Sequence, residues 1–185
     1  MKTIGITGGV GAGKSTVLAY LEEKYNAFVI QADEVGHIVM APGQECYQPV
    51  IDLFGKDVIK NDKTIDRKQV SDVVFGNELM RQSLDAIIHP AVKTYILEEI
   101  RKQRQAGCRL LVIEAALLLE EKYDAFCDQV WYVHTDQEIR IERLMSSRGY
   151  TREKALSIIK RQASKAFFRQ NTDYVIANNG LPEET

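Results

Sequence analysis

The amino-acid sequence predicts a three-layer α/β fold, with a parallel five-stranded sheet, a helical insertion and a short helical lid. The prediction starts from KTIGIT at residues 2–7, a β-branched run typical of a buried strand. A glycine-rich stretch follows from Gly8 to Ser15, and Val17, Leu18 and Leu21 then recur at helical spacing. Further short strands separated by helical segments indicate that the sheet is parallel.

The stretch GGVGAGKS fits the pattern of a phosphate-binding loop, or P-loop: glycine, four residues, then Gly-Lys-Ser. Such a loop turns its backbone N–H groups toward a polyphosphate, and side chains would block that approach. Lys14 is placed to reach the β and γ phosphates as a catalytic residue, and the hydroxyl of Ser15 suits Mg²⁺. The residues expected to bind the nucleotide are Gly8, Gly9, Gly11, Ala12, Gly13, Lys14, Ser15 and Thr16.

A glycine-rich turn with an incidental lysine is the alternative interpretation of this stretch. A strand directly before it and a helix directly after it favour the P-loop, because the helix start aims its free N–H groups and its positive dipole end at the phosphates.

Composition limits the class of protein. The 185 residues suffice for one domain, and a net charge of −2 gives no general positive field for binding nucleic acid. Cys46, Cys108 and Cys127 lack the spacing of a disulfide framework or a zinc site. No signal peptide or membrane-spanning run is visible, so we expect a cytoplasmic protein that does not bind membranes.

A second strand is predicted at residues 27–31, and it leads directly into Asp33. Ligands of parallel α/β sheets bind at the carboxyl ends of the strands, so Asp33 is expected to face the phosphates. Asp is also a good N-cap residue, and Asp33 precedes a helical pattern. Both interpretations remain open from the sequence.

The segment 34–107 lacks a clear parallel strand and is predicted to be a helical insertion that forms the acceptor pocket. Helices are expected before Gly55, after the capping residue Asp66 and after the capping residue Asn77. His89-Pro90 is expected to interrupt the last of these, with a new helix beginning at the proline.

The sheet resumes after residue 107, so residues 1–33 and 108–185 form the predicted nucleotide-binding core. An apolar strand at residues 110–113 ends in Glu114, which is expected to hold Mg²⁺; a surface glutamate is the alternative. Two more strands are predicted at residues 129–135 and 174–177. The final LPEET is too short for a closing helix.

Residues 140–166 are predicted to form a basic lid over the phosphates. Arg140 and Arg143 share a helix flank directed away from the core, and Ile141, Leu144 and Met145 are expected to point inward. Arg148 follows near the end of that helix. Thr151 caps the next helix, whose basic side chains face outward; a solvated basic surface is the alternative.

Over nearly its whole length, the sequence resembles the dephospho-CoA kinase family. The resemblance extends beyond ITGGVGAGKST to Asp33 in QAD, DLFG at residues 52–55 and His89-Pro90. It continues with RLMSSRGYT, Gln162 and VIANNG. These pieces are individually weak, but their order and spacing together are specific. One departure is the loss of a proline after Glu114, where many members have Asp-x-Pro-Leu-Leu.

The resemblance implies a kinase that uses ATP with Mg²⁺ to phosphorylate dephospho-CoA, and a monomer is the default expectation. It implies that Asp33 acts on the acceptor 3′-hydroxyl and that His89 and Arg140 help to bind the acceptor. Arg143 and Arg148 would act as catalytic lid residues, and Asn178 would lie by the adenine.

Two other classes of function fit the sequence less well. Another small-molecule kinase, acting on a nucleoside monophosphate or shikimate, would not need so long an insertion with His89-Pro90. A nucleotide-dependent switch that binds guanine would need Asn-Lys-x-Asp, and Asn61-Asp62-Lys63 has the wrong order. Formation of a phosphorylated product distinguishes the kinase from the switch.

Overall fold

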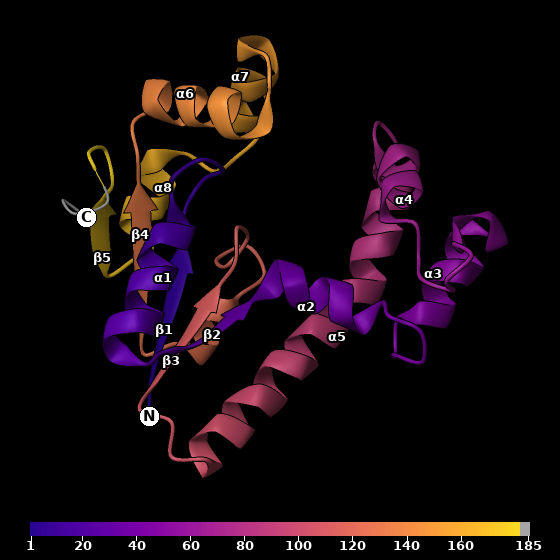
Figure 1. Ribbon diagram of the computed structural model, residues 1–185, viewed down its shortest axis with the longest axis horizontal. Coiled ribbons are helices and arrows are strands. Elements are labelled where there is room, and N and C mark those ends of the chain that lie inside the picture. The colour runs from indigo at the N-terminus through magenta and orange to yellow at the C-terminus, as the bar shows by residue number, and fades with distance from the viewer. Residues whose placement is uncertain (182–185) are drawn as a thin grey trace. The chain divides into compact units, whose positions relative to one another are not determined.

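The computed structural model describes residues 1–181 and divides into two compact units (Figure 1). The core unit comprises Met1–Ile30 and Lys102–Thr185, and the insertion unit comprises Gln31–Arg101. The expectation that the tail forms no helix falls mostly on residues 182–185, outside the described residues.

A parallel sheet of five strands forms the centre of the core unit, as the sequence predicts. The order of the strands in the sheet is β2-β3-β1-β4-β5. Strand β1 is the middle strand, and it pairs in register with β3 through Ile6 and Glu114 and with β4 through Ile6 and Trp131. The strands are β1 (Lys2–Thr7), β2 (Phe28–Gln31), β3 (Leu110–Glu114), β4 (Gln129–His134) and β5 (Tyr174–Ala177).

Helices lie on both faces of the sheet. Helix α1 (Lys14–Tyr25) buries Val17, Leu18 and Leu21 in a cluster that includes Val133 of β4. Neighbouring side chains of a strand point to opposite faces, so Tyr132 faces away from α1. It stacks on Phe168 of α8 (Lys165–Gln170), with ring centroids 4.7 Å apart. A short 3₁₀ helix, η2 (Tyr123–Phe126), connects β3 to β4.

Helices α6 (Gln137–Arg148) and α7 (Arg152–Lys160) form the segment predicted to be the lid. Gly149, at φ 63°, ends α6, and the hydroxyl of Thr151 accepts a hydrogen bond from the backbone of Lys154, as expected for a cap. Ile141 and Leu144 pack with Ala155. The predicted inward orientation of Met145 is wrong: it is 43% exposed, since the contact with α7 covers only the stripe of Ile141 and Leu144.

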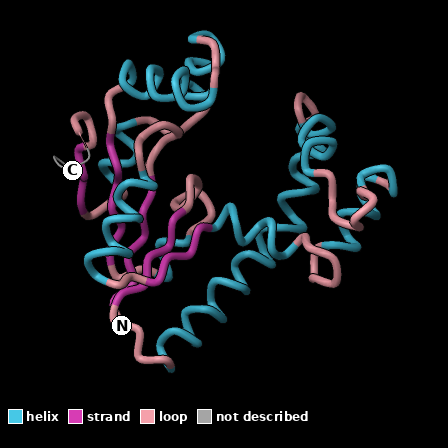
Figure 2. The backbone as a smooth tube through the Cα atoms, in the orientation of Figure 1, coloured by secondary structure: helices cyan, strands magenta, loops and turns pink. Residues whose placement is uncertain are grey.

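The insertion unit is helical apart from short connections (Figure 2). Asp66 caps its helix as predicted, accepting hydrogen bonds from the backbone of Lys68 and Gln69. Asn77 likewise accepts one from Met80. The elements are α2 (Ala32–Val39), α3 (Tyr47–Phe54), the 3₁₀ helix η1 (Lys56–Val58), α4 (Arg67–Val74) and α5 (Glu78–Gln105), whose last residues belong to the core unit.

Pro90 does not interrupt its helix, and this prediction is wrong. Helix α5 continues for 28 residues with Pro90 inside it. Proline removes one backbone hydrogen bond and crowds the preceding turn, a penalty of about 3 kcal/mol in an isolated helix. Burial of the apolar stripe on the following turns, including Val92, Ile96 and Ile100, offsets that penalty. Among residues 1–181, no helix is long and apolar enough to cross a bilayer.

Candidate phosphate-binding site

The glycine-rich loop lies between the carboxyl end of β1 and the start of α1, as predicted. Gly13 immediately precedes the helix in a left-handed conformation, with φ 83° and ψ 31°. A Cβ atom at this position would lie 2.1 Å from the side-chain nitrogen of Asn178. Both the backbone conformation and the lack of space require glycine here.

Two buried polar side chains hold the carbonyl groups of the loop. The Asn178 amide Nδ2 donates to the carbonyl oxygen of Ala12 at 2.9 Å and to that of Gly13 at 3.4 Å. The hydroxyl of Thr135 lies 2.9 Å from the carbonyl oxygens of Ala12 and Asn178. These hydrogen bonds tie the loop carbonyl groups to the residues that follow β4 and β5. The negative ends of the carbonyl dipoles therefore point away from the amide side of the loop, where an anion would bind.

Lys14 folds back across the loop. Its Nζ donates to the carbonyl oxygen of Gly8 at 2.9 Å and lies 3.4 Å from Oε1 of Glu114. Glu114 ends β3 beside β1 and is buried, with 7% of its surface exposed, so the interpretation of it as a surface glutamate is wrong. The structure therefore brings Lys14 and Glu114 together, as expected if both face the phosphates.

Arg140 braces the tip of the loop. Its Nε donates to the carbonyl oxygen of Val10 at 2.8 Å, and its Nη2 donates to the side-chain oxygen of Gln162. That oxygen also accepts a hydrogen bond from the backbone N–H of Val10 at 3.1 Å. Partial burial lowers the pKa of the Arg140 guanidinium from its ordinary value, but arginine stays protonated in proteins. The prediction that Arg140 points away from the core is therefore wrong, because the glycine-rich loop packs against that side of the helix.

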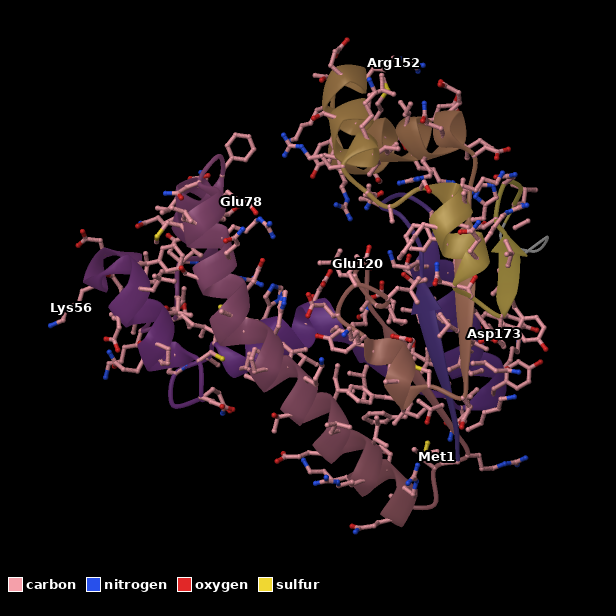
Figure 3. The ribbon with its side chains drawn as sticks, turned by 180° about the vertical axis from the view of Figure 1, so that it is seen from behind. Met1, Lys56, Glu78, Glu120, Arg152 and Asp173 are labelled. Carbon is pink, nitrogen blue, oxygen red and sulfur yellow. The ribbon has the colours of Figure 1, made fainter. Side chains whose placement is uncertain are left out.

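The other two lid arginines are more open. Arg143 makes two long hydrogen bonds of 3.4 Å, to the hydroxyl of Thr135 and to the carbonyl oxygen of Gly180. Arg148 is exposed and makes no side-chain hydrogen bond or ion pair within the described part of the chain. Figure 3 labels Arg152, which begins α7 after these arginines. For Arg148, both the lid interpretation and that of a solvated surface stay open.

A third group of side chains, not identified from the sequence, supports the end of β4. His134 lies 3.2 Å from the hydroxyl of Tyr132 and 3.1 Å from a carboxylate oxygen of Asp136. The Asn179 side chain in turn accepts a hydrogen bond from the backbone of Asp136. Burial lowers the pKa of His134, with the positive charge of Lys165 adding to the effect. These residues join the ends of β4 and β5, where Thr135 and Asn178 contact the loop.

Asp33 and His89 belong to the insertion unit. The N-cap position of α2 is Gln31, and Asp33 lies in the first turn with its side chain exposed. The capping interpretation of Asp33 is therefore wrong. His89 on α5 lies 3.6 Å from a carboxylate oxygen of Asp85, one turn earlier. The roles of both residues remain predictions.

The residues expected to bind Mg²⁺ fit that ion only in combination with a nucleotide. Within residues 1–181, no three His, Cys, Asp or Glu side chains cluster to hold a metal. Ser15 and Glu114 would supply a hydroxyl and a carboxylate. Mg²⁺ in kinases commonly takes its remaining oxygen ligands from substrate phosphates and water, so this short donor set is what a nucleotide-dependent site needs.

A cavity of about 780 Å³ lies beside α1, but its lining is unsuited to phosphates. It is lined mainly by apolar and aromatic side chains such as Tyr20, Trp131 and Ile176. Among the loop residues expected to bind nucleotide, only Thr16 lines it. Phosphate binding needs N–H donors and positive charge, which this mainly apolar lining does not offer.

A family model described as dephospho-CoA kinase matches residues 2–184. This chain belongs to the dephospho-CoA kinase family. A dephospho-CoA kinase of Geobacillus kaustophilus is 38% identical over 183 residues, covering 99% of this chain and 90% of the relative. One of Carboxydothermus hydrogenoformans is 37% identical over 182 residues, covering 98% of this chain and 88% of the relative.

Solved structures agree on the fold of this dephospho-CoA kinase family member. A Thermus thermophilus protein has a TM-score of 0.83 at 26% identity, covering 99% of this chain and 91% of its own. The dephospho-CoA kinase of Campylobacter jejuni has a TM-score of 0.71 at 24% identity, covering 98% of this chain and 90% of its own. A shikimate kinase of Acinetobacter baumannii, at a TM-score of 0.53 and 15% identity, shows only that the core resembles that of other P-loop kinases.

The buried position of Asn178 predicts that Asn178→Ala weakens ATP binding. Without the amide, the carbonyl groups of Ala12 and Gly13 lose a donor, so the loop becomes less ordered and the protein loses about 1–3 kcal/mol of stability. The dissociation constant of ATP, measured by isothermal titration, should rise several-fold, and the melting temperature should fall. Asn179→Ala, which changes a neighbouring amide that contacts Asp136 instead, is the control. ATP affinity unchanged in Asn178→Ala would contradict this role.

Proposed function

We propose that this protein transfers the γ-phosphoryl group of ATP to the 3′-hydroxyl of dephospho-CoA, giving coenzyme A and ADP, the last step of coenzyme A biosynthesis. The observation that carries the proposal is the match to the dephospho-CoA kinase family across residues 2–184. The loop geometry supports it, because the conserved chemistry of phosphoryl transfer needs a phosphate cradle with an adjacent lysine and acid.

ATP binding would use the backbone of the loop and the start of α1. Free N–H groups and the positive end of the helix dipole favour the phosphates there. The present partners of Lys14 are a carbonyl and a carboxylate oxygen. Phosphate oxygens can replace both, so Lys14 needs only to reorient its side chain to contact the β and γ phosphates.

Mg²⁺ would be held by the Ser15 hydroxyl and the Glu114 carboxylate, directly or through water, together with the nucleotide. When bound, it neutralises the charge that develops on the phosphate oxygens. Lys14, now 3.4 Å from the Glu114 carboxylate, would turn toward the phosphates as the carboxylate takes this role.

Arg143 and Arg148 would contact the transferring phosphoryl group from the lid. Both guanidinium groups are less firmly bound than that of Arg140, and arginine offers paired N–H donors to phosphate. Arg140 holds the loop to the segment around Gln162, which would couple lid position to loop geometry. Its further role toward the acceptor, and that of His89, are part of the proposal.

Asp33 would accept the proton of the acceptor hydroxyl. It follows β2, at the carboxyl edge of the parallel sheet where ligands of such folds bind. A ribose hydroxyl needs an orienting group and, late in the transfer, a place for its proton. The exposed carboxylate in the first turn of α2 has no capping function that would occupy it.

A coupled ADP-release assay tests the proposed function most simply. We expect ADP formation with dephospho-CoA to exceed that with AMP, with shikimate and without an acceptor. Removal of Mg²⁺ with EDTA should abolish it. Equal ADP release with and without dephospho-CoA would indicate an ATPase or a nucleotide switch and would refute the kinase assignment.

Asp33→Asn separates catalysis from folding. Because Asp33 caps no helix, this variant should keep its melting temperature and its ATP affinity. Loss of the proton acceptor should lower turnover with saturating dephospho-CoA by roughly 10² or more. Glu34→Gln, one residue along α2 and also exposed, is the matched control. Near-normal turnover in a folded Asp33→Asn protein would remove Asp33 from the mechanism.

A further inference from the structure

The tip of the glycine-rich loop is held by a closed triangle of hydrogen bonds among Val10, Arg140 and Gln162. The side-chain oxygen of Gln162 accepts the backbone N–H of Val10 at 3.1 Å and a second hydrogen bond from Nη2 of Arg140. Nε of Arg140 donates to the carbonyl oxygen of Val10 at 2.8 Å. Each residue is therefore bonded to the other two, and both lone pairs of the Gln162 oxygen are used.

The triangle joins both ends of the lid segment to the loop. Arg140 lies on α6, at the beginning of that segment. Gln162 lies near its end, in the short connection between α7 and α8. All three residues of the triangle are partly buried, so water competes less for their hydrogen bonds than it would at an open surface. One side chain, that of Gln162, thus connects the end of the lid to its beginning and to the loop.

Helix α6 packs directly on the loop, and two of the loop glycines make this contact possible. A side chain at Gly9 would overlap the guanidinium group of Arg140. A Cβ atom at Gly11 would lie 3.1 Å from the carbonyl oxygen of Arg140 and 3.2 Å from Cγ of Leu144. The side chain of Val10 packs against the apolar cluster that joins α6 to α7. The loop tip and the lid therefore share one packed contact.

Arg143 lies on the face of α6 that contacts the loop, because it follows Arg140 by three residues. Its Nη1 lies 3.3 Å from the point where a Cβ atom would lie on Gly13, the residue before α1. The same nitrogen is 3.4 Å from the hydroxyl of Thr135, which contacts the loop carbonyl of Ala12. The position of α6 along the loop therefore determines where the guanidinium group of Arg143 lies.

We infer that Gln162 is a positioning residue for phosphoryl transfer. Through Val10 and Arg140 it fixes α6 against the loop, and so it holds Arg143 at the phosphates. The inference rests on the proposed function, in which Arg143 contacts the transferring phosphoryl group. A displacement of about 1 Å in a catalytic group can lower a rate by roughly 10²-fold, so a residue that fixes this helix controls turnover without contacting a substrate.

Two substitutions of Gln162 separate its hydrogen bonds from its packing. Gln162→Leu keeps most of the side-chain volume but removes the acceptor, whereas Gln162→Glu keeps an oxygen for both donors. The matched control is Gln137→Leu, which changes an exposed amide side chain at the start of α6. Thermal melting confirms folding of each variant. If Gln162→Leu does not fold, Gln162→Asn replaces it, because its amide is one methylene too short to reach both donors.

The effect should fall on kcat more than on the KM for ATP. With saturating ATP and dephospho-CoA, Gln162→Leu should lower kcat by roughly tenfold or more. Its KM for ATP should rise by less than about threefold, since Asn178 and Thr135 still hold the rest of the loop. Gln162→Glu and Gln137→Leu should stay within a few-fold of the wild type. In amide hydrogen exchange, the N–H of Val10 should exchange faster in Gln162→Leu, a readout that does not depend on activity.

A double-mutant cycle tests whether Gln162 acts through Arg143. Arg143→Ala alone should lower kcat, and adding Gln162→Leu should lower it little further, because no guanidinium group is left to position. Losses of kcat that multiply would overturn the inference, since they would show two independent effects. Unchanged kcat in folded Gln162→Leu or in Arg143→Ala would also overturn it.

The results distinguish failure of this inference from failure of the proposed function. Wild-type protein that releases no ADP with dephospho-CoA would refute the function and, with it, the inference. With an active wild type, two outcomes would refute the inference alone. One is an unchanged exchange rate of the Val10 N–H in Gln162→Leu. The other is an equal loss of kcat in Gln162→Glu and Gln162→Leu, which would show that the acceptor oxygen has no part in the effect.

Discussion

The phosphate-binding loop depends on the hydrogen bonds that hold its carbonyl groups to the ends of β4 and β5. Thr135 and Asn178 supply these bonds from adjacent strands, and both side chains are buried. They can do so only because β4 and β5 run parallel to β1, which brings the carboxyl ends of all three strands to one edge. The order of the sheet thus determines the shape of the loop, and the Tyr132–His134–Asp136 group keeps that edge in place.

Charge at this edge is balanced within the protein before any nucleotide binds. Lys14 and Glu114 are largely shielded from solvent, with side chains 14% and 10% exposed, so their attraction is weakly screened. An unpaired charge at such a position would be costly. With a nucleotide and Mg²⁺ bound as we propose, phosphate oxygens would become partners of Lys14, and the cation would become a partner of Glu114. Such an exchange would let both residues be buried and still take part in binding.

Features set by local sequence could be predicted, and features set by distant contacts could not. The β1–loop–α1 unit and the caps at Asp66 and Asn77 follow from neighbouring residues, and the structure confirms them. The continuity of α5 through Pro90 depends on burial of its later turns, which no local rule reveals. The contacts of Arg140 and Gln162 with Val10 join residues more than a hundred positions apart. Thr135 could have been identified from its place at the carboxyl end of a strand.

The claim that the glycine-rich loop is the catalytic phosphate site is tested most directly by the turnover of Lys14→Ala. Lys14 contacts both the loop and the buried Glu114, and the proposed chemistry needs its charge at the phosphates. ATP and dephospho-CoA should be saturating, and the temperature should lie below the melting transition of the variant. Lys24→Ala, on the exposed last turn of the same helix, is the control. We predict that Lys14→Ala loses turnover by roughly 10² or more while Lys24→Ala stays near the wild type. Turnover of folded Lys14→Ala within a few-fold of the wild type would contradict the account.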